Sequence, residues 1–149
     1  MAAGTAVHVA PFDELSPATL YALLRLRVDV FVVEQECAYA ELDGRDDEPG
    51  TRHLWISGAD GDPRAYLRIL RDGDGTAHLG RVAVVLPYRG TGLAAQLMDA
   101  ALAHIGDAPC ELEAQVQVAD FYTRWGFVVT GPQFDLDGIP HVPMRRPGT

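Results

Sequence analysis

Residues 78–105, HLGRVAVVLPYRGTGLAAQLMDAALAHI, decide the fold of this chain. The segment 78–86 is rich in valine and is followed by Pro87, which has no backbone donor to continue a ladder, so it predicts a strand. Beyond Gly90 and Gly92 the apolar residues recur at helical spacing, which predicts a buried helix that begins inside the glycine turn. The unpaired N–H groups and the dipole at such a helix start favour an anion, above all a phosphate.

The bulk properties of the sequence fit a single domain over residues 1–149. The chain is 48% hydrophobic, and no stretch is long and apolar enough to span a bilayer. The segment 1–10 lacks the basic and apolar regions of an export signal. Cys37 and Cys110 are too few for a disulfide framework and stand at no metal-ligand spacing. We therefore expect a cytoplasmic protein with no membrane partner and no metal.

The formal net charge of -9 bears on the choice of partner. It argues against nucleic acid, because phosphate binding needs an excess of Lys and Arg on one face. A surplus of carboxylates suits a cationic substrate, but a solvated acidic surface explains the same charge without any substrate.

The first helix is predicted from residue 17 to about residue 33. Ser16 can cap the free N–H groups of a helix start, and Pro17 fits the first turn. The predicted apolar face consists of residues at helical spacing, which are Leu20, Leu24, Val28 and Phe31. The segment 34–49 is acidic and rich in turn residues, so we expect it to pack little and to border a cleft or solvent.

The other elements complete a mixed α/β (α+β) pattern. Strands at 53–57 and 64–71 lead into the strand at 78–86, which predicts an antiparallel meander. After the central helix we expect a strand at 110–116, a short helix at 119–125, a strand at 126–130, and a hairpin of 134–136 and 141–144 that turns at Asp137 and Gly138. The predicted fold is one strongly twisted mixed sheet of about six or seven strands, flanked by about three or four helices.

The glycine turn also resembles other nucleotide-binding motifs. Gly90, Gly92 and Ala95 satisfy the GxGxxA dinucleotide fingerprint, with Glu111 or Glu113 about 20 residues on, where a ribose-binding acid is expected. That fold normally places the motif in its first strand-to-helix turn, whereas a helix and three strands precede it here. A P-loop is excluded because no Lys follows the glycines. A merely structural helix start is the other alternative.

Two longer runs carry a resemblance to a known family. They are RVAV at 81–84 with PYRGTGLA at 87–94, and ADFYTRWGF at 119–127. The first resembles the R/Q-x-x-G-x-G/A pyrophosphate loop, and the second the terminal FYxxxGF element, of the GNAT superfamily of acyl-CoA-dependent N-acyltransferases. Ala94 stands where many members have a second glycine. Three further runs, VFVVEQEC at 30–37, ELDG at 41–44 and DGIPH at 137–141, resemble the ElaA-like branch of that superfamily.

The resemblance implies that acetyl-CoA, as co-substrate, lies along the strand at 78–86. Its pantetheine amides would pair with backbone groups near Val82 and Val84, and its acyl carbonyl would accept from the N–H at or beside Val84. The pyrophosphate would meet the N–H groups at 89–94, with a charge-assisted contact from Arg89. The implied cofactor-binding residues are Val82, Ala83, Val84, Arg89, Gly90, Thr91, Gly92, Leu93 and Ala94.

The resemblance also implies catalytic roles for two residues. Tyr122 takes the position of the family's frequent general acid, which would serve the departing CoA thiolate. Its alternative role is aromatic packing between the last helix and the sheet. Glu34 is the implied base, because the end of the first helix borders the acceptor pocket in this family. A solvated surface acid is its alternative.

Four residues are candidates for contact with the acceptor: Glu36, His53, Gln115 and His141. A carboxylate can hold a cation, a histidine can act as a base near neutral pH, and an amide can hydrogen-bond the substrate. Each has an ordinary structural alternative, as a surface acid, a strand-end histidine or a solvent-facing glutamine. Cys37 has no identifiable partner and is expected to be a small buried hydrophobe.

Together with this resemblance, the sequence predicts an N-acetyltransferase that moves acetyl from acetyl-CoA directly to a primary amine of a small molecule or peptide. One rival is a non-catalytic module that binds or senses acyl-CoA. The other is a nucleotide-dependent oxidoreductase built on GxGxxA, which the order of elements disfavours. An edge strand in the last hairpin could pair with a second subunit to form a homodimer.

Overall fold

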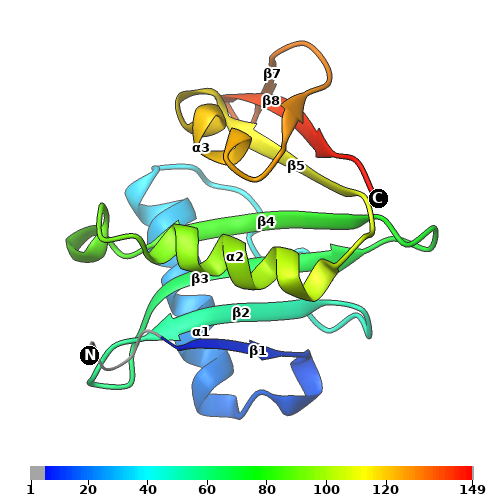
Figure 1. Ribbon diagram of the computed structural model, residues 1–149. Coiled ribbons are helices and arrows are strands. Elements are labelled where there is room, and N and C mark those ends of the chain that lie inside the picture. The colour runs from blue at the N-terminus through cyan, green and yellow to red at the C-terminus, as the bar shows by residue number, and fades with distance from the viewer. Residues whose placement is uncertain (1–5, 149) are drawn as a thin grey trace.

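A computed structural model describes residues 6–148 and shows one mixed, eight-stranded sheet (Figure 1). The strand order is β1-β2-β3-β4-β5-β8-β6, and β7 pairs with β8 beside this path. The strands are β1 (Val7–Ala10), β2 (Arg52–Ser57), β3 (Pro63–Arg71), β4 (Ala77–Val84), β5 (Cys110–Gln115), β6 (Val128–Val129), β7 (Phe134–Leu136) and β8 (Ile139–Arg146). The predicted fold class is confirmed, although β1 lies outside the elements that we predicted.

Helices cover both faces of the sheet, with α1 behind it and α2 in front of it in Figure 1. The helical segments are α1 (Pro17–Val28), the π-helix η2 (Asp29–Glu34), α2 (Leu93–Ile105) and α3 (Ala119–Thr123). Helix α2 packs on the face that carries Leu67, and α1 on the face that carries Tyr66. These neighbours point to opposite faces because successive side chains of a strand alternate. None of the helices described is long and apolar enough to cross a membrane.

The start of α1 is as predicted, but its buried face is not. The hydroxyl of Ser16 accepts a hydrogen bond from the Thr19 N–H at 3.1 Å, and Pro17 is the first helical residue. The buried positions are Leu23, Leu26, Arg27 and Val30, whereas the predicted apolar residues are only partly buried. Arg27 occupies one position of the buried face of α1. A search for apolar residues alone therefore predicts a face that is rotated from the buried one.

The prediction that the segment 34–49 packs little was wrong. Its Glu41 is 3% exposed and accepts a hydrogen bond from Nε of the fully buried Arg27 at 2.7 Å. Asp46 accepts another from Nη1 of Arg27 at 2.7 Å, and Asp43 pairs with Arg68 at 2.8 Å. Glu41 is buried and Asp46 is partly buried because they neutralise arginines that α1 and the sheet bring beneath the segment.

The predicted meander and final hairpin are confirmed. Strands β2, β3 and β4 pair in sequence as antiparallel neighbours, and β7 pairs with β8 around the turn at Asp137 and Gly138. Strand β4 stops at Val84, two residues before its predicted end, because Leu86–Tyr88 form a turn of 3-10 helix with Pro87. Elsewhere the boundaries differ from prediction by a few residues.

Strands β4 and β5 separate after a short parallel contact, as Figure 1 shows. Their paired residues are Ala77 with Cys110 and His78 with Glu111, and beyond these the two strands diverge. A bulge in β4 places Arg81 and Val82 opposite Leu67 alone, and Arg81 has a φ of 55°. The edge of β4 beyond His78 is therefore free of β5.

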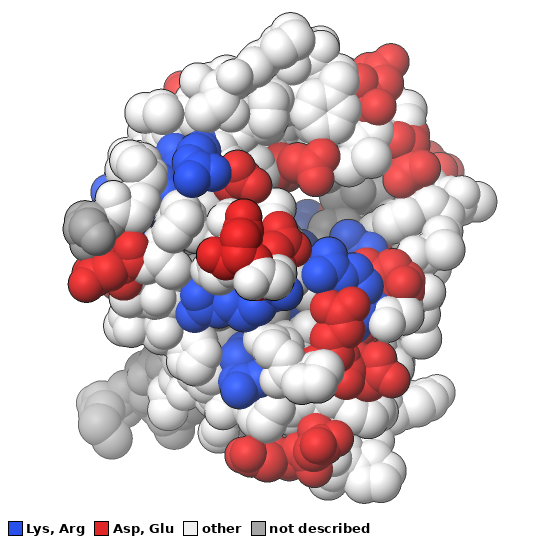
Figure 2. Space-filling view, turned by 90° about the vertical axis from the view of Figure 1, so that its right-hand side faces the viewer, with Lys and Arg blue, Asp and Glu red and all other residues white. Residues whose placement is uncertain are grey.

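Charge on the surface is mixed. On the face seen in Figure 2, arginines lie beside carboxylates and no large area carries one sign. Beneath the segment 34–49, Arg68 likewise pairs with Asp43 at 2.8 Å and with Asp46 at 3.1 Å. Much of the negative charge thus serves to neutralise arginines of the chain itself.

Candidate functional site

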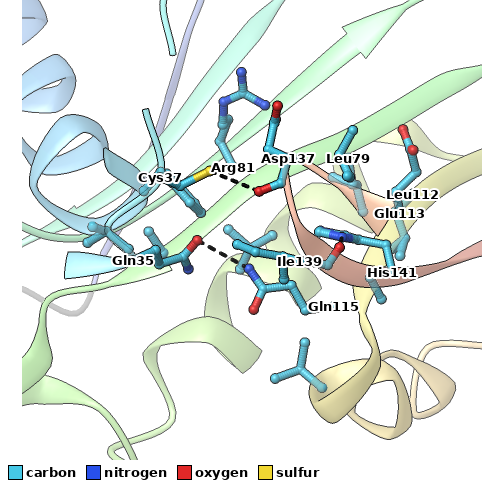
Figure 3. Close-up of a pocket in the computed structure, with 18 of the residues that line it drawn as sticks. Gln35, Cys37, Leu79, Arg81, Leu112, Glu113, Gln115, Asp137, Ile139 and His141 are labelled. Atoms are coloured by element: carbon cyan, nitrogen blue, oxygen red, sulfur yellow. Dashed lines mark hydrogen bonds between the residues drawn. The ribbon is translucent and has the colours of Figure 1, made fainter. Parts of the chain in front are cut away.

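The divergence of β4 and β5 opens a cavity of about 330 Å³, which we call the split cavity (Figure 3). Its walls come mainly from η2 with the loop after it, β4, β5 and the β7–β8 hairpin, and they are completed by Arg89, Val118 and Tyr122. Two side-chain contacts join these parts across it. The thiol of Cys37 donates to the Asp137 carbonyl at 3.3 Å, and the amide of Gln115 donates to Gln35 at 3.4 Å.

A second cavity of about 490 Å³ lies beside the glycine turn, and we call it the loop cavity. It shares a wall with the split cavity that includes Val82, Val84 and Tyr122. Of the predicted cofactor-binding residues, the structure brings all except Thr91 to its lining: Val82, Ala83, Val84, Arg89, Gly90, Gly92, Leu93 and Ala94. The hydroxyl of Thr91 instead donates to the Tyr88 carbonyl at 2.6 Å.

The glycine turn presents a row of unused backbone donors. Gly90 and Gly92 have φ values of 79° and 88°, which only glycine adopts readily, and Gly92 is the N-cap of α2 without a capping side chain. Within residues 6–148, no hydrogen bond takes up the N–H groups of residues 90–94. A Cβ at either glycine would meet nothing within 4 Å, so an anion can approach these donors closely.

Arg89 is turned away from these donors. Its guanidinium holds the Glu34 carboxylate through two hydrogen bonds of 2.6 and 2.7 Å, and its Nε donates to the Val84 carbonyl at 2.7 Å. The hydrogen bonds from Arg89 hold the pKa of Glu34 below its usual range. In this arrangement Glu34 is an engaged carboxylate and a weak base, and Glu34 and Val84 take up three of the five N–H groups of Arg89.

Arg124 is the cation in the loop cavity that sequence reasoning missed. Its guanidinium lies over the rings of Trp125 and Phe121, at 4.7 and 5.5 Å from their centroids. The indole of Trp125 donates to Asp99 on α2 at 2.8 Å, which fixes that ring. Among the residues described, no carboxylate pairs with Arg124. The signal was present in the sequence as an arginine between aromatic residues in the run at 119–127.

Tyr122 stands where the two cavities meet. Its ring packs edge-on against Phe121 and Phe127, at centroid distances of 5.2 and 6.3 Å, and the residue is 8% exposed. Burial raises the pKa of Tyr122 to about 12, so the hydroxyl stays protonated at neutral pH. No hydrogen bond inside the described part of the chain uses this hydroxyl, and it is free to donate to a bound molecule.

Two of the predicted acceptor residues do not reach the split cavity. His53 is 1% exposed, and its ring nitrogens contact the Tyr66 hydroxyl at 2.6 Å and the Asp46 carbonyl at 3.0 Å. Glu36 is exposed and does not line the cavity. His53 is enclosed with the buried charges and Glu36 faces solvent, so neither is retained as a substrate-binding residue.

The other two acceptor candidates, Gln115 and His141, both line the split cavity. They lie directly opposite each other on β5 and β8. The Oε1 of Gln115 accepts from Gln117 at 2.7 Å, and Nδ1 of His141 lies 2.7 Å from the Ile139 carbonyl. Cys37 is also in the lining and only partly buried, contrary to its expected place in the core.

Sequence reasoning missed several polar residues of the split cavity, which are Gln35, Tyr39, Arg81, Glu113 and Asp137. Arg81 is held at the β4 bulge by the Glu41 carboxylate, which accepts from its Nε at 2.9 Å. These residues come together only through long-range contacts, so no local pattern announces them. In residues 6–148 no cluster of His, Cys, Asp and Glu is arranged to hold a metal ion.

Comparison with known proteins identifies a family model, similar sequences and similar structures. A family model described as an acetyltransferase (GNAT) domain matches residues 23–147. A UPF0039 protein of Mycobacterium tuberculosis is 46% identical over 139 residues, which cover 91% of this chain and 89% of that protein. The crystal structure of an acyl-CoA N-acyltransferase from Pseudomonas aeruginosa superposes with a TM-score of 0.89 at 41% identity, and that of Escherichia coli ElaA with 0.89 at 37%. Both cover 95% of this chain, and this chain covers 98% of each.

Proposed function

The chain belongs to the GNAT acetyltransferase family, and from that premise we propose that it transfers an acetyl group from acetyl-CoA directly to a primary amine. The acceptor is a small molecule or a peptide. The observation that carries the proposal is the row of free N–H groups at residues 90–94, which opens into a cavity that meets a second one at Tyr122.

In the proposed complex the phosphates of CoA occupy the loop cavity. The free N–H groups at the start of α2 face the pyrophosphate, and the dipole of the helix adds to their attraction. Arg124 supplies the positive charge that the phosphates need, because Arg89 is engaged by Glu34. Arg89 then serves to hold η2 against the end of β4.

The pantetheine arm follows the free edge of β4. Val85 donates to the Arg64 carbonyl on β3 at 2.9 Å, and backbone groups of successive strand residues point in opposite directions. The N–H of Val84 therefore points away from β3, toward the split. It is the proposed donor to the thioester oxygen, and such a donor is worth about 3 kcal/mol in the transition state.

The reaction needs no covalent enzyme intermediate. The neutral amine attacks the thioester carbonyl, the C–N bond forms, and the C–S bond breaks. The Tyr122 hydroxyl, which is protonated at neutral pH, donates to the sulfur as negative charge develops there. Tyr122 fits this role because it lines both cavities, so it lies between the cofactor and the acceptor.

Two measurements test the proposal. Isothermal titration with acetyl-CoA should show binding, and a thiol-release screen of amines with acetyl-CoA should find at least one acceptor. Absence of binding at millimolar acetyl-CoA would contradict the proposed function. Binding without release by any amine would favour the rival, a non-catalytic acyl-CoA sensor.

A further inference from the structure

His141 lines the split cavity and has one ring nitrogen that no hydrogen bond in the described residues uses. The residue is 8% exposed, follows the β7–β8 turn and lines the cavity beside Gln115 and Glu113 (Figure 3). His141 lies directly opposite Gln115 in the antiparallel pair, and Glu113 is two residues earlier on β5. The three side chains therefore share one face of the sheet.

The backbone of the hairpin fixes the tautomer of His141. Its Nδ1 lies 2.7 Å from the Ile139 carbonyl oxygen, which can only accept a hydrogen bond. In the neutral ring Nδ1 therefore carries the proton, and Nε2 holds the lone pair. Phe134 stacks on the imidazole at a centroid distance of 6.1 Å and an angle of 30°, which holds the ring in this orientation.

The lone pair on Nε2 has no partner in the described part of the protein. The hydrogen bond of the His141 ring runs through Nδ1. Among the described residues every side-chain nitrogen or oxygen that is sealed from solvent has a partner, so Nε2 keeps some contact with solvent, and the residue lines the split cavity. Nε2 is an unpaired acceptor on a nearly buried residue that lines the cavity of the proposed reaction.

The other candidate bases are less suitable. Glu34 is held by the Arg89 guanidinium, and His53 is enclosed with both ring nitrogens occupied. Carboxylates are ordinarily much weaker bases than imidazole near neutral pH. The geometry thus singles out the histidine on β8.

We propose that Nε2 of His141 is the general base that takes the proton from the acceptor amine. The inference rests on the proposed function and adds its missing catalytic residue. The acceptor nitrogen loses two protons, one as the ammonium becomes a nucleophile and one as the C–N bond forms. One of these protons ends on the CoA sulfur, and the other passes through His141 to solvent.

The charges around His141 favour a cationic acceptor. The titratable side chains that line the cavity with it are Glu113 on β5, Asp137 in the hairpin turn, Glu34, Cys37 and Tyr39 from the first half, Arg81 and Arg89 near β4, and Tyr122 on α3. Arg81 and Arg89 are neutralised by Glu41 and Glu34. Among the described residues Glu113 and Asp137 form no ion pair, so their charges remain available to hold an ammonium.

The test compares two nucleophiles in H141Q. Glutamine keeps a side-chain donor for the Ile139 carbonyl but cannot act as a base. With the alkylamine that the wild type acetylates fastest, we expect kcat/KM to fall about 100-fold, as for loss of a general base. With hydroxylamine, which is already unprotonated at neutral pH, the fall should be under tenfold. The affinity for acetyl-CoA should equal that of the wild type.

Several outcomes decide the matter. The control His104→Gln, on the exposed face of α2, should change neither rate. Equal losses with the two nucleophiles, at unchanged acetyl-CoA affinity, would overturn the role of His141 and leave the proposed function intact. Nitrogen NMR of the wild type that places the proton on Nε2 would overturn it as well. Failure of the wild type to bind acetyl-CoA would remove both proposals.

Discussion

The loop cavity and the split cavity share a wall but are built in different ways. Most of the loop cavity comes from residues 82–95, one continuous stretch whose strand, glycine turn and helix start follow from local chemistry. The split cavity gathers residues from 30–39, 79–84, 112–115 and 136–141, together with Arg89, Val118 and Tyr122. A local backbone feature can be recognised in sequence, whereas a juxtaposition of distant segments cannot.

The two cavities also differ in how they handle positive charge. In the loop cavity Arg124 rests on aromatic rings and faces no carboxylate among the described residues. Around the split cavity Arg27 and Arg81 share the carboxylate of Glu41, at 2.7 and 2.9 Å. The loop cavity therefore has an arginine that is available to a ligand, whereas the arginines around the split cavity are paired with a carboxylate and stabilise its wall.

The largest expected effect concerns the wall of the split cavity. Glu41→Ala leaves the buried Arg27 with Asp46 as its remaining carboxylate partner and removes the 2.9 Å contact of Arg81, and removal of one member of a buried pair typically costs about 3–5 kcal/mol. We expect a loss of this size in the free energy of unfolding, measured with urea. Asp60→Ala, which breaks the exposed contact of Asp60 with Arg64 at 3.9 Å, is the control and should change it by less than about 1 kcal/mol. Equal small losses would mean that the buried pair does not hold the wall.

The next largest effect is expected for Tyr122, in the wall that the two cavities share. Tyr122→Phe removes the hydroxyl at the meeting point of the cavities, and we expect kcat to fall about 100-fold with acetyl-CoA affinity near wild type. Stopped-assay thiol release and titration with acetyl-CoA measure the two quantities. Tyr21→Phe, at a residue that is 73% exposed, should leave both unchanged. An unaltered kcat would assign Tyr122 to packing and the protonation of sulfur to water.

The loop cavity is probed by Arg124→Gln. We expect KM for acetyl-CoA to rise about tenfold, because a charge-assisted contact is worth about 1.5 kcal/mol. KM for acetyl-pantetheine, which lacks the phosphates, should stay the same. Arg25→Gln, in the exposed pair with Asp29, is the matched control. If Arg89→Gln alone raised the KM for acetyl-CoA relative to acetyl-pantetheine, the division of labour between the two arginines would be reversed.

The smallest effect is a dependence of stability on pH. Burial alone would raise the pKa of Asp46, but its hydrogen bond and attraction to Arg27 lower it below 3.8. A lowered pKa in the folded state adds stability above pH 3.8, and this stability is lost as the pH falls below that value. The slope for one proton is at most about 1.4 kcal/mol per pH unit. Asp46→Asn should be less stable at pH 7 and flatter in acid, as urea unfolding at several pH values would reveal.

Much of the fold could be predicted because its signals are local. The glycine turn, the meander and the hairpin turn at Asp137 and Gly138 each rest on residues within a few positions of one another. We did not predict strand β1, because four residues at a sheet edge are too few to show an alternating apolar pattern. We did not predict the packing of the segment 34–49, because burial of a carboxylate such as Glu41 depends on an arginine elsewhere in the chain, here Arg27.

The site divides in the same way. Nearly all predicted cofactor residues line the loop cavity, since they follow from one motif. On the acceptor side Gln115 and His141 reach the split cavity, whereas His53 and Glu36 do not. A histidine at a strand start looks the same in sequence whether it faces a cavity or, like His53, the Tyr66 hydroxyl.

Because β5 pairs with β4 only briefly, a small rotation of β5 and its partner β8 about that contact moves the far end of β5. Strand β5 is anchored to β4 through Cys110 and Glu111, and Gln115 lies four residues beyond Glu111, which is about 13 Å at about 3.3 Å each. A rotation of about 4° at the anchor would move Gln115 by about 1 Å over that length, and a shift of that size can alter a reaction rate about 100-fold. We therefore expect the pairing of His78 with Glu111, at the end of β5 farthest from Gln115, to influence the geometry of the proposed reaction.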